Sequence, residues 1–311
     1  MNAPTREEFL AQRMKGIGGS DAGTIMGANP YKTAYELYLE KRQELEAEDI
    51  GDKLPVKIGI DLEDFVAKEY QDQTGFKVQR FNNQLQHPDH PWMLGNLDRV
   101  VSLDGKAPAH KGELRTKRLL ECKTALGRFL DKTMWGPSGT DQVPEHYFFQ
   151  CMHYLAVSGA DQIDLAVLLA GPEVRIYHIV RDEELIALMI KVEGTFWQQV
   201  QSGKAPEMDF NHPTTGALLD RLYPGTDGST IELPATAEHW QQVMADAKEQ
   251  KALYEKVAEG AKNHILHLMG NAAIAKLPDG TAFTRKVIKK KAFSVEATEY
   301  VDFRYTKNPK E

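Results

Sequence analysis

The sequence predicts an α/β core over residues 1–230, followed by a helix-and-hairpin extension over residues 235–311. Three observations lead to this prediction. Amphipathic helical patterns precede residue 75, strand patterns dominate residues 76–125, and a helix, two strands and a second helix follow residue 143. A segment dense in Pro, Gly, Ser and Thr, residues 223–234, marks the boundary between the two parts.

The first part opens with three helical patterns. A glycine-rich turn at residues 13–19 leads into Ser20 and Asp21, both of which are good helix N-caps. An Asn-Pro turn at residue 29 starts an amphipathic helix, and the polar residues 44–57 indicate a loop. Apolar residues at spacings of three and four predict a helix from residue 61 that stops at Gly75.

Strands and helices alternate through the rest of the core. Strand patterns cover residues 76–81, 92–103 and 113–125, and residues 124–143 have the composition of a mobile loop. Pro144 and Gly159 bracket a helix. Two further strands, at 163–170 and 174–180, precede a long amphipathic helix that ends near residue 203.

The extension begins with a long helix that Thr236 can cap and that runs to Gly270. Its apolar residues repeat at a spacing near 3.5 and are interrupted by Gln250 and His264, which predicts a face that needs a partner. These apolar residues are Trp240, Val243, Ala247, Tyr254, Val257, Ala261 and Leu268. A Pro-Asp-Gly turn then predicts a β-hairpin over residues 274–293.

Composition excludes several classes of protein. No run approaches the roughly 18 apolar residues of a membrane span, and residues 1–13 lack the apolar region of a secretory signal. Two cysteines without a Cys-x-x-Cys pair favour a reducing cytosol over a disulfide scaffold or a zinc ribbon. The net charge of −7 divides into −10 for residues 1–234 and +3 for residues 235–311, so mean charge does not decide whether the partner is a polyanion.

Glu121 and Lys123 carry the first chemical signal. They follow two leucines in a strand pattern, and strand alternation points both side chains to one face. Burying an unpaired charge costs several kcal/mol, so each needs a partner. By themselves the two residues are compatible with a mutual ion pair at a sheet edge or with a catalytic site.

Asp98 interrupts a second strand pattern, which is unfavourable for an aspartate unless a cation lies nearby. Asp98 and Glu121 on adjacent strands can bind an oxygen-seeking ion such as Mg²⁺, with the main-chain carbonyl of Cys122 as a third ligand. Lys123 can then orient or help to deprotonate a water, or stabilise charge on a phosphate. The thiol of Cys122 points to the opposite face and is expected to be a small core group.

Three further polar residues stand on helical patterns. Glu63 follows a Gly turn and is either a solvated helix acid or a group that supports the metal. Gln150 and Tyr154 share one helix face, where they are either a hydrogen-bonded core pair or part of the site. His153 is expected to pack or to be exposed, and not to act as a ligand.

Taken together, Asp98, Glu121-x-Lys123 and Gln150-x-x-x-Tyr154 resemble the PD-(D/E)xK nuclease superfamily. The stretches GIGGSD, GNLDR, LECKT and QCMHY, in this order, are similar to the phage-type alkaline exonucleases, or YqaJ-type viral recombinases, which include lambda exonuclease. The resemblance covers roughly residues 10–200. It implies a restriction-endonuclease-like core, in which a mixed central β-sheet is flanked by helices.

The resemblance also implies residue roles. Asp98 and Glu121 match the metal-binding acids, Lys123 the catalytic lysine, Glu63 the helix glutamate that supports the metal site, and Gln150 the glutamine placed near the lysine or the scissile strand. Two ions of Mg²⁺ are implied, with Mn²⁺ as a substitute. The matching positions for the 5′-phosphate and DNA contacts are Arg13, Ser20, Asn96 and Tyr154, where Asn96 replaces a serine of some relatives.

The implied activity is 5′-to-3′ exonuclease cleavage of one strand of linear double-stranded DNA to mononucleotides. The 3′ single strand that emerges would serve a single-strand annealing protein in phage recombination, in the cytoplasm of a bacterial host. Relatives form homotrimer rings around DNA, and a basic bore would reconcile the negative net charge. Two alternatives stay open: an endonuclease that uses the same acids, and a non-catalytic DNA-binding scaffold.

The basic hairpin of the extension could contact DNA or the annealing protein, or be a solvated surface. Its basic residues are Arg285, Lys286, Lys289, Lys290 and Lys291.

Overall fold

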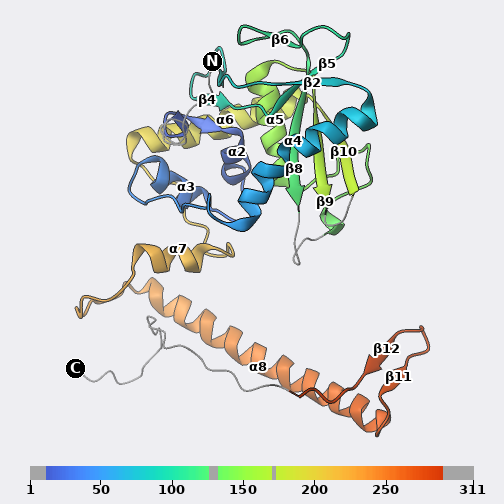
Figure 1. Cartoon of the computed structure of the whole chain (residues 1–311). Helices are drawn as coiled ribbons and strands as arrows, with labels where there is room; N and C mark the ends of the chain where they lie inside the picture. The colour runs from blue at the N-terminus through green and yellow to red at the C-terminus, as the bar shows by residue number, and fades with distance from the viewer. Residues whose placement is uncertain (1–11, 126–131, 170–172, 290–311) are drawn as a thin grey trace. The chain divides into compact units, whose positions relative to one another are not determined.

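The structure is a computed structural model that describes residues 12–125, 132–169 and 173–289. The chain divides into two compact units, Met1–Leu222 and Tyr223–Glu311. The first unit contains a mixed sheet with helices on both faces, the fold class that the sequence predicts (Figure 1).

The central sheet has five strands in the order β10-β9-β8-β5-β2. Only the β8–β9 pair is parallel, and the other three neighbouring pairs are antiparallel. A parallel pair needs a crossover connection, and helix α5 (Glu145–Ser158) supplies it between β8 and β9. The strands are β2 (Lys77–Arg80), β5 (Arg99–Ser102), β8 (Arg118–Ala125), β9 (Gln162–Leu169) and β10 (Glu173–Val180).

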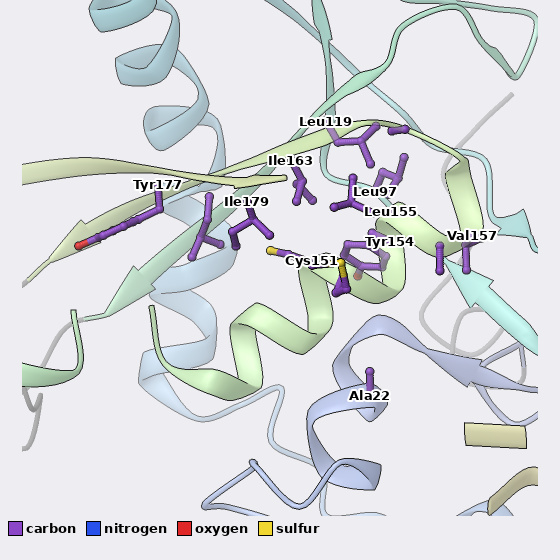
Figure 2. Close-up of a cluster of buried hydrophobic side chains, with 14 of the residues drawn as sticks. Ala22, Leu97, Leu119, Cys151, Tyr154, Leu155, Val157, Ile163, Tyr177 and Ile179 are labelled. Atoms are coloured by element: carbon purple, nitrogen blue, oxygen red, sulfur yellow. The ribbon is translucent and has the colours of Figure 1, made fainter. Parts of the chain in front are cut away.

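Strand alternation sends successive side chains of β8 to opposite layers. Leu119 joins the large cluster under α5, where Cys151 and Leu155 of the helix approach Ile163 and other sheet residues (Figure 2). Leu120 and Cys122 join the second cluster, under helix α4 (Leu54–Thr74), with Val66, Ala67 and Tyr70 of that helix. The two helices therefore cover opposite faces of one sheet, and β8 is buried between them (Figure 1).

A smaller sheet, in the order β1-β4-β3, joins the N-terminal segment to this core. Its strands are β1 (Ile17–Gly18), β3 (Leu85–Gln86) and β4 (Met93–Gly95). Helix α2 (Gly19–Ile25) follows β1 directly and packs on α5 through glycines. A Cβ at Gly23 would lie 2.8 Å from the Cα of His146, so only glycine permits this close approach.

Helices α3 (Ala34–Lys41), α6 (Glu183–Ser202) and α7 (Thr215–Leu222) complete the first unit. Leu37 of α3 and Phe196 of α6 share a third apolar cluster. The fully buried His153 of α5 lies with Nδ1 3.0 Å from Glu193 of α6 and Nε2 3.0 Å from the carbonyl of Leu94 on β4. His153 is thus a buried packing residue that ties three elements together.

The second unit contains helix α8 (Thr236–Met269) and the antiparallel hairpin β11 (Ile274–Lys276) and β12 (Ala282–Thr284). The long helix and the hairpin confirm two predictions from the sequence. Residue 235 is the N-cap of α8 and Thr236 its first helical residue. Lys290 and Lys291 lie outside the described residues.

Several predicted boundaries are wrong. Helix α4 begins at Leu54, within the segment predicted as a loop, with Pro55 in its first turn, so Gly59 lies inside the helix rather than in a turn before Glu63. The N-cap of α2 is Gly18, whose N–H donates to the Asp21 carboxylate at 3.1 Å. Helix α7 and the strands β3 and β6 (Ala109–His110) were not predicted, and the predicted strand 113–125 is divided into β7 (Glu113–Leu114) and β8.

The segment predicted as a mobile loop, residues 124–143, is described only in part. Residues 124 and 125 belong to β8, and a 3₁₀ turn, η1 (Lys132–Met134), follows the gap. Residues 126–131 lie outside the described residues.

Gly23→Ala should destabilise the first unit. Alanine gains about 1 kcal/mol of helix propensity, but the clash with the His146 backbone costs more, typically about 1–3 kcal/mol. Thermal unfolding should show a melting temperature several degrees lower. Gly216→Ala in α7 is the control, because a Cβ there meets no atom within 4 Å, and its melting temperature should stay or rise. Equal effects of the two substitutions would contradict the packing argument.

Candidate active site

The centre of the site is the Glu121 carboxylate on β8, which is only 2% exposed. Its Oε1 accepts hydrogen bonds from Lys123 Nζ at 2.6 Å and from Gln150 Nε2 at 2.7 Å. Lys123 reaches it because both residues point to the α5 face of the strand, and Gln150 reaches it from α5. The strand and the crossover helix thus meet at one carboxylate oxygen.

Asp98 lies directly across from Glu121. The register pairs Arg99 with Leu120, so the preceding Asp98 falls level with Glu121. Its Oδ2 accepts the backbone N–H of Cys122 at 2.9 Å. The sequence predicted Asp98 in the middle of one strand, but that run splits into β4 and β5, and Asp98 lies at the bend before β5. There the Asp98 carboxylate accepts the hydrogen bond from the Cys122 N–H that a main-chain carbonyl would accept in a continuous strand pair.

This geometry fits a divalent cation. The other oxygen of Glu121, Oε2, is buried and has no hydrogen-bond partner. The N–H and C=O of one residue in a strand point to the same side, so the Cys122 carbonyl faces the edge where Asp98 lies. Two carboxylates and a carbonyl are the oxygen ligands that Mg²⁺ prefers. No group of three or more His, Cys, Asp or Glu side chains suited to a metal occurs among the described residues.

The electrostatics of the site support the same conclusion. Burial, together with the negative charge of Asp98, raises the pKa of Glu121 to about 8. Burial lowers the pKa of Lys123, but Glu121 and Asp98 outweigh it and raise that pKa above its usual value. Lys123 therefore stays protonated at neutral pH. Its single positive charge lies near two carboxylates, those of Glu121 and Asp98.

The thiol of Cys122 lies in the apolar cluster under α4, on the face opposite Glu121. Burial raises its pKa well above the ordinary value, so it is a poor nucleophile. This placement is the one that strand alternation predicts.

Glu63 lies on α4, and the structure connects it to the site through Arg99. Arg99 Nη1 donates to Glu63 Oε1 at 2.5 Å and to the carbonyl oxygen of Asp98 at 2.7 Å. The same guanidinium also pairs with Asp64. Glu63 is therefore a half-buried, ion-paired residue, and its predicted support of a metal stays a prediction.

Arg13 and Ser20, two of the predicted 5′-phosphate and DNA contacts, form a second cluster with Asp21 at the start of α2. Arg13 Nη2 donates to Ser20 Oγ at 3.0 Å and to Asp21 Oδ1 at 3.1 Å. Ser20 is exposed, whereas Asp21 is buried. Burial raises the pKa of Asp21, but Lys41 and Arg13 outweigh it and hold that pKa well below its usual range.

Lys41 of α3 holds this cluster in place through three hydrogen bonds. Its buried ammonium donates to the Asp21 carboxylate at 2.7 Å and to the carbonyls of Arg13 at 2.6 Å and Gly16 at 2.7 Å. The backbone that carries Arg13 and the carboxylate that orients its guanidinium are thus held by one side chain.

Tyr154 joins the two clusters. Its hydroxyl accepts from Gln150 Nε2 at 3.2 Å, and a Cβ at Gly19 would lie 2.4 Å from its ring. Tyr154 is buried, so the structure gives it a packing position between α2 and α5, and its contact with DNA stays a prediction. Asn96 lies half-buried between β4 and β5, and its predicted phosphate contact also stays a prediction.

Three residues of these clusters were not predicted. Arg99 could have been noticed as a charged residue inside an apolar strand. Asp21 was assigned only a capping role. Lys41 resembles any lysine on an amphipathic helix, and no local signal distinguishes it.

Comparison with known proteins now places the chain in a family. Residues 8–161 match the YqaJ-like viral recombinase domain. The chain is also 34% identical over 271 residues to "Uncharacterized protein YqaJ" of Bacillus subtilis (strain 168), over 86% of this chain and 79% of that protein. The chain belongs to the YqaJ-like viral recombinase family.

Solved structures with a similar arrangement include two exonucleases. An alkaline exonuclease of Laribacter hongkongensis (LHK-Exo) is 18% identical, with a TM-score of 0.48 over 64% of this chain and 94% of that one. A phage related exonuclease from Haemophilus somnus 129PT is 14% identical, with a TM-score of 0.44 over 63% of this chain and all of that one. Within the described part of the chain, no helix combines the length and apolarity that crossing a membrane requires.

A divalent cation should bind this site more tightly as pH rises. With a pKa of about 8, Glu121 is mostly protonated at pH 7 and mostly ionised at pH 9, and a ligand carboxylate must be ionised. Calorimetric titration with Mg²⁺ should therefore show an affinity about tenfold higher at pH 9 than at pH 7. Glu121→Gln should bind weakly at both pH values. An affinity of the native chain that does not change with pH would contradict this assignment.

Proposed function

We propose that this member of the family is a Mg²⁺-dependent exonuclease that degrades one strand of linear double-stranded DNA from its 5′ end. The products would be mononucleotides with 5′-phosphates and a 3′ single strand. The observation that carries the proposal is the buried Glu121 carboxylate. It lies level with Asp98, accepts from both Lys123 and Gln150, and keeps one oxygen without a partner.

The cation would be held by Asp98, Glu121 and the Cys122 carbonyl. When bound there, it supplies Lewis-acid stabilisation of charge on the scissile phosphate and lowers the pKa of water; a second Mg²⁺, or Mn²⁺ in its place, would act in the same way. The residues present suit this use. Among the described side chains, Lys123 is the one cation within hydrogen-bond distance of Glu121.

Lys123 acts as a cation rather than as a base. Its raised pKa keeps the ammonium protonated, so it donates hydrogen bonds and positive charge to the phosphate as negative charge develops. Glu121 Oε1 fixes the position of the ammonium at 2.6 Å, and Gln150 holds the carboxylate in place from α5. Of the two roles that the sequence left open for Lys123, water activation and charge stabilisation, its raised pKa supports charge stabilisation.

Arg13 and Ser20 suit the recognition of a terminal 5′-phosphate. A guanidinium offers several donors in a fixed plane, and the Ser20 hydroxyl lies 3.0 Å from one of them. Asp21 takes part of the charge of Arg13 but leaves it exposed enough to meet a ligand, with 37% of its side chain accessible. Recognition of the end would then select linear DNA and set the 5′-to-3′ direction.

Larger assemblies belong to the same proposal. A homotrimer ring around the DNA would supply processivity, and the 3′ strand would pass to a single-strand annealing protein in the bacterial cytoplasm. The ring and the annealing protein are both inferred from the resemblance of the motifs to the family. A structure- or site-specific endonuclease with the same acids is the second candidate, since the cluster of acids and lysine is common to both.

Linear and covalently closed plasmid DNA should distinguish the two. With Mg²⁺, the linear form should be degraded progressively from its ends, whereas the closed circle should remain intact because it has no end to bind. Gel electrophoresis and release of acid-soluble nucleotides measure the outcome. Cutting of closed circles would instead support the endonuclease. Loss of neither substrate would support a non-catalytic scaffold.

Lys123→Ala should reduce the cleavage rate by at least about 10²-fold, the scale seen when one charge-stabilising donor is removed from an active site. Binding of linear DNA should change little, as measured by fluorescence anisotropy in Ca²⁺. Lys77→Ala is the matched control, since Lys77 is an exposed lysine on β2 of the same sheet. A cleavage rate for Lys123→Ala close to that of the control would refute the assigned role.

Arg13→Ala should remove the preference for 5′-phosphorylated ends over 5′-hydroxyl ends. The ratio of the two initial rates is the measurement, and it is insensitive to a general loss of active protein. Arg13→Lys should restore part of the preference, because a lysine keeps the charge but loses the planar fork. A ratio that stays at the native value in Arg13→Ala would place the phosphate site elsewhere.

A further inference from the structure

Helix α8 presents a long apolar face that no described residue of its own unit, 223–289, covers. Nine successive positions from 240 to 268 alternate at spacings of three and four, which is the heptad pattern of a coiled coil sustained over four heptads. The large side chains on this face are exposed: Trp240 is 65% exposed, Tyr254 68% and Leu268 85%. This exposed face is the apolar stripe whose periodicity indicates a partner helix.

The sizes of the side chains indicate how a partner helix must lie. The first core position of each heptad alternates large and small, and the second alternates valine with a polar residue. In order, the first set is Trp240, Ala247, Tyr254, Ala261 and Leu268, and the second is Val243, Gln250, Val257 and His264. A parallel, in-register pair of identical helices would place two tryptophans in one layer and two alanines in the next. Such layers are overpacked and underpacked in turn, and both cost stability.

An antiparallel pair of two copies removes this mismatch. In that arrangement the first position of one helix packs against the second position of the other. A two-fold axis near residue 252 gives four kinds of layer, each formed twice. The layers are Trp240 with His264, Val243 with Ala261, Ala247 with Val257, and Gln250 with Tyr254. Each small residue then faces a valine, and each polar residue faces an aromatic ring that carries a hydrogen-bonding group.

We propose that α8 pairs with α8 of a second copy of this chain as an antiparallel coiled coil centred near residue 252. The helix has 34 residues, about 50 Å, so the paired stripe spans most of its length. Through this contact, the second unit links two copies of the chain whatever assembly state the first unit has.

Substitution at the core of the stripe tests the association. Val257→Glu in the full chain should lower the mass of the assembly at least two-fold in light scattering after size exclusion. Ala252→Glu is the matched control, because Ala252 lies on the outer face of the helix, and its mass should equal that of the native chain. Equal masses for both variants would overturn the proposal. Circular dichroism shows whether each variant keeps its helix content.

Cross-linking tests the direction. Chains that carry Ala247→Cys and chains that carry Val257→Cys are treated with a short bis-maleimide, separately and mixed. The antiparallel register predicts cross-linked dimers in the mixture and none in either variant alone. Dimers from Ala247→Cys alone would show a parallel pair and overturn the register. The native chain is the background control, since its cysteines, Cys122 and Cys151, are buried.

Discussion

The architecture of the first unit depends on one constraint, the burial of the Glu121 carboxylate inside the sheet. A carboxylate with 2% exposure is costly unless donors surround it. Lys123 supplies one donor from the same strand, and Gln150 supplies another from the crossover helix. The parallel β8–β9 pair requires that helix, so the topology of the sheet brings Gln150 to Glu121.

The donors satisfy only half of the carboxylate. Both reach Oε1, while Oε2 is buried without a partner, and Asp98 adds negative charge across the strand gap. Protonation of Glu121 relieves this repulsion, which is one cause of its raised pKa. A bound divalent cation would relieve it more completely, because it would neutralise both acids at once. The cost of burying Glu121 therefore supports the proposed cation site, and binding there would depend on pH.

The face to which each side chain of β8 points was predictable, because it depends only on position along the strand. The period of two in residues 119–123 is enough to place Leu120 and Cys122 on one face and Glu121 and Lys123 on the other, as the clusters on the two faces confirm. The bend at Asp98 was not predictable, because the group that replaces the ladder bond is the Cys122 N–H, 24 residues later. The role of Lys41 depends on carbonyls 25 and 28 residues away, and no sequence pattern encodes such a meeting.

Helices α4 and α5, which present Glu63 and Gln150, are each fixed by a buried polar link, and a third link holds the segment of Arg13. Tyr70 of α4 donates to Asp164 of β9 at 2.5 Å and lies seven residues, or two turns, after Glu63, on the same face. His153 fixes α5 to Leu94 and Glu193, next to Tyr154. Lys41 fixes α3 to the segment that carries Arg13.

These links do what apolar packing cannot. Apolar contacts hold the helices against the sheet, but they are non-directional and tolerate small rotations of a helix about its axis. A hydrogen bond to a fixed carbonyl or carboxylate fails when the helix rotates, since its strength falls steeply with angle. The buried polar links therefore fix the rotation of α4 and α5, which decides where Glu63 and Gln150 point, and Lys41 fixes the backbone from which Arg13 extends.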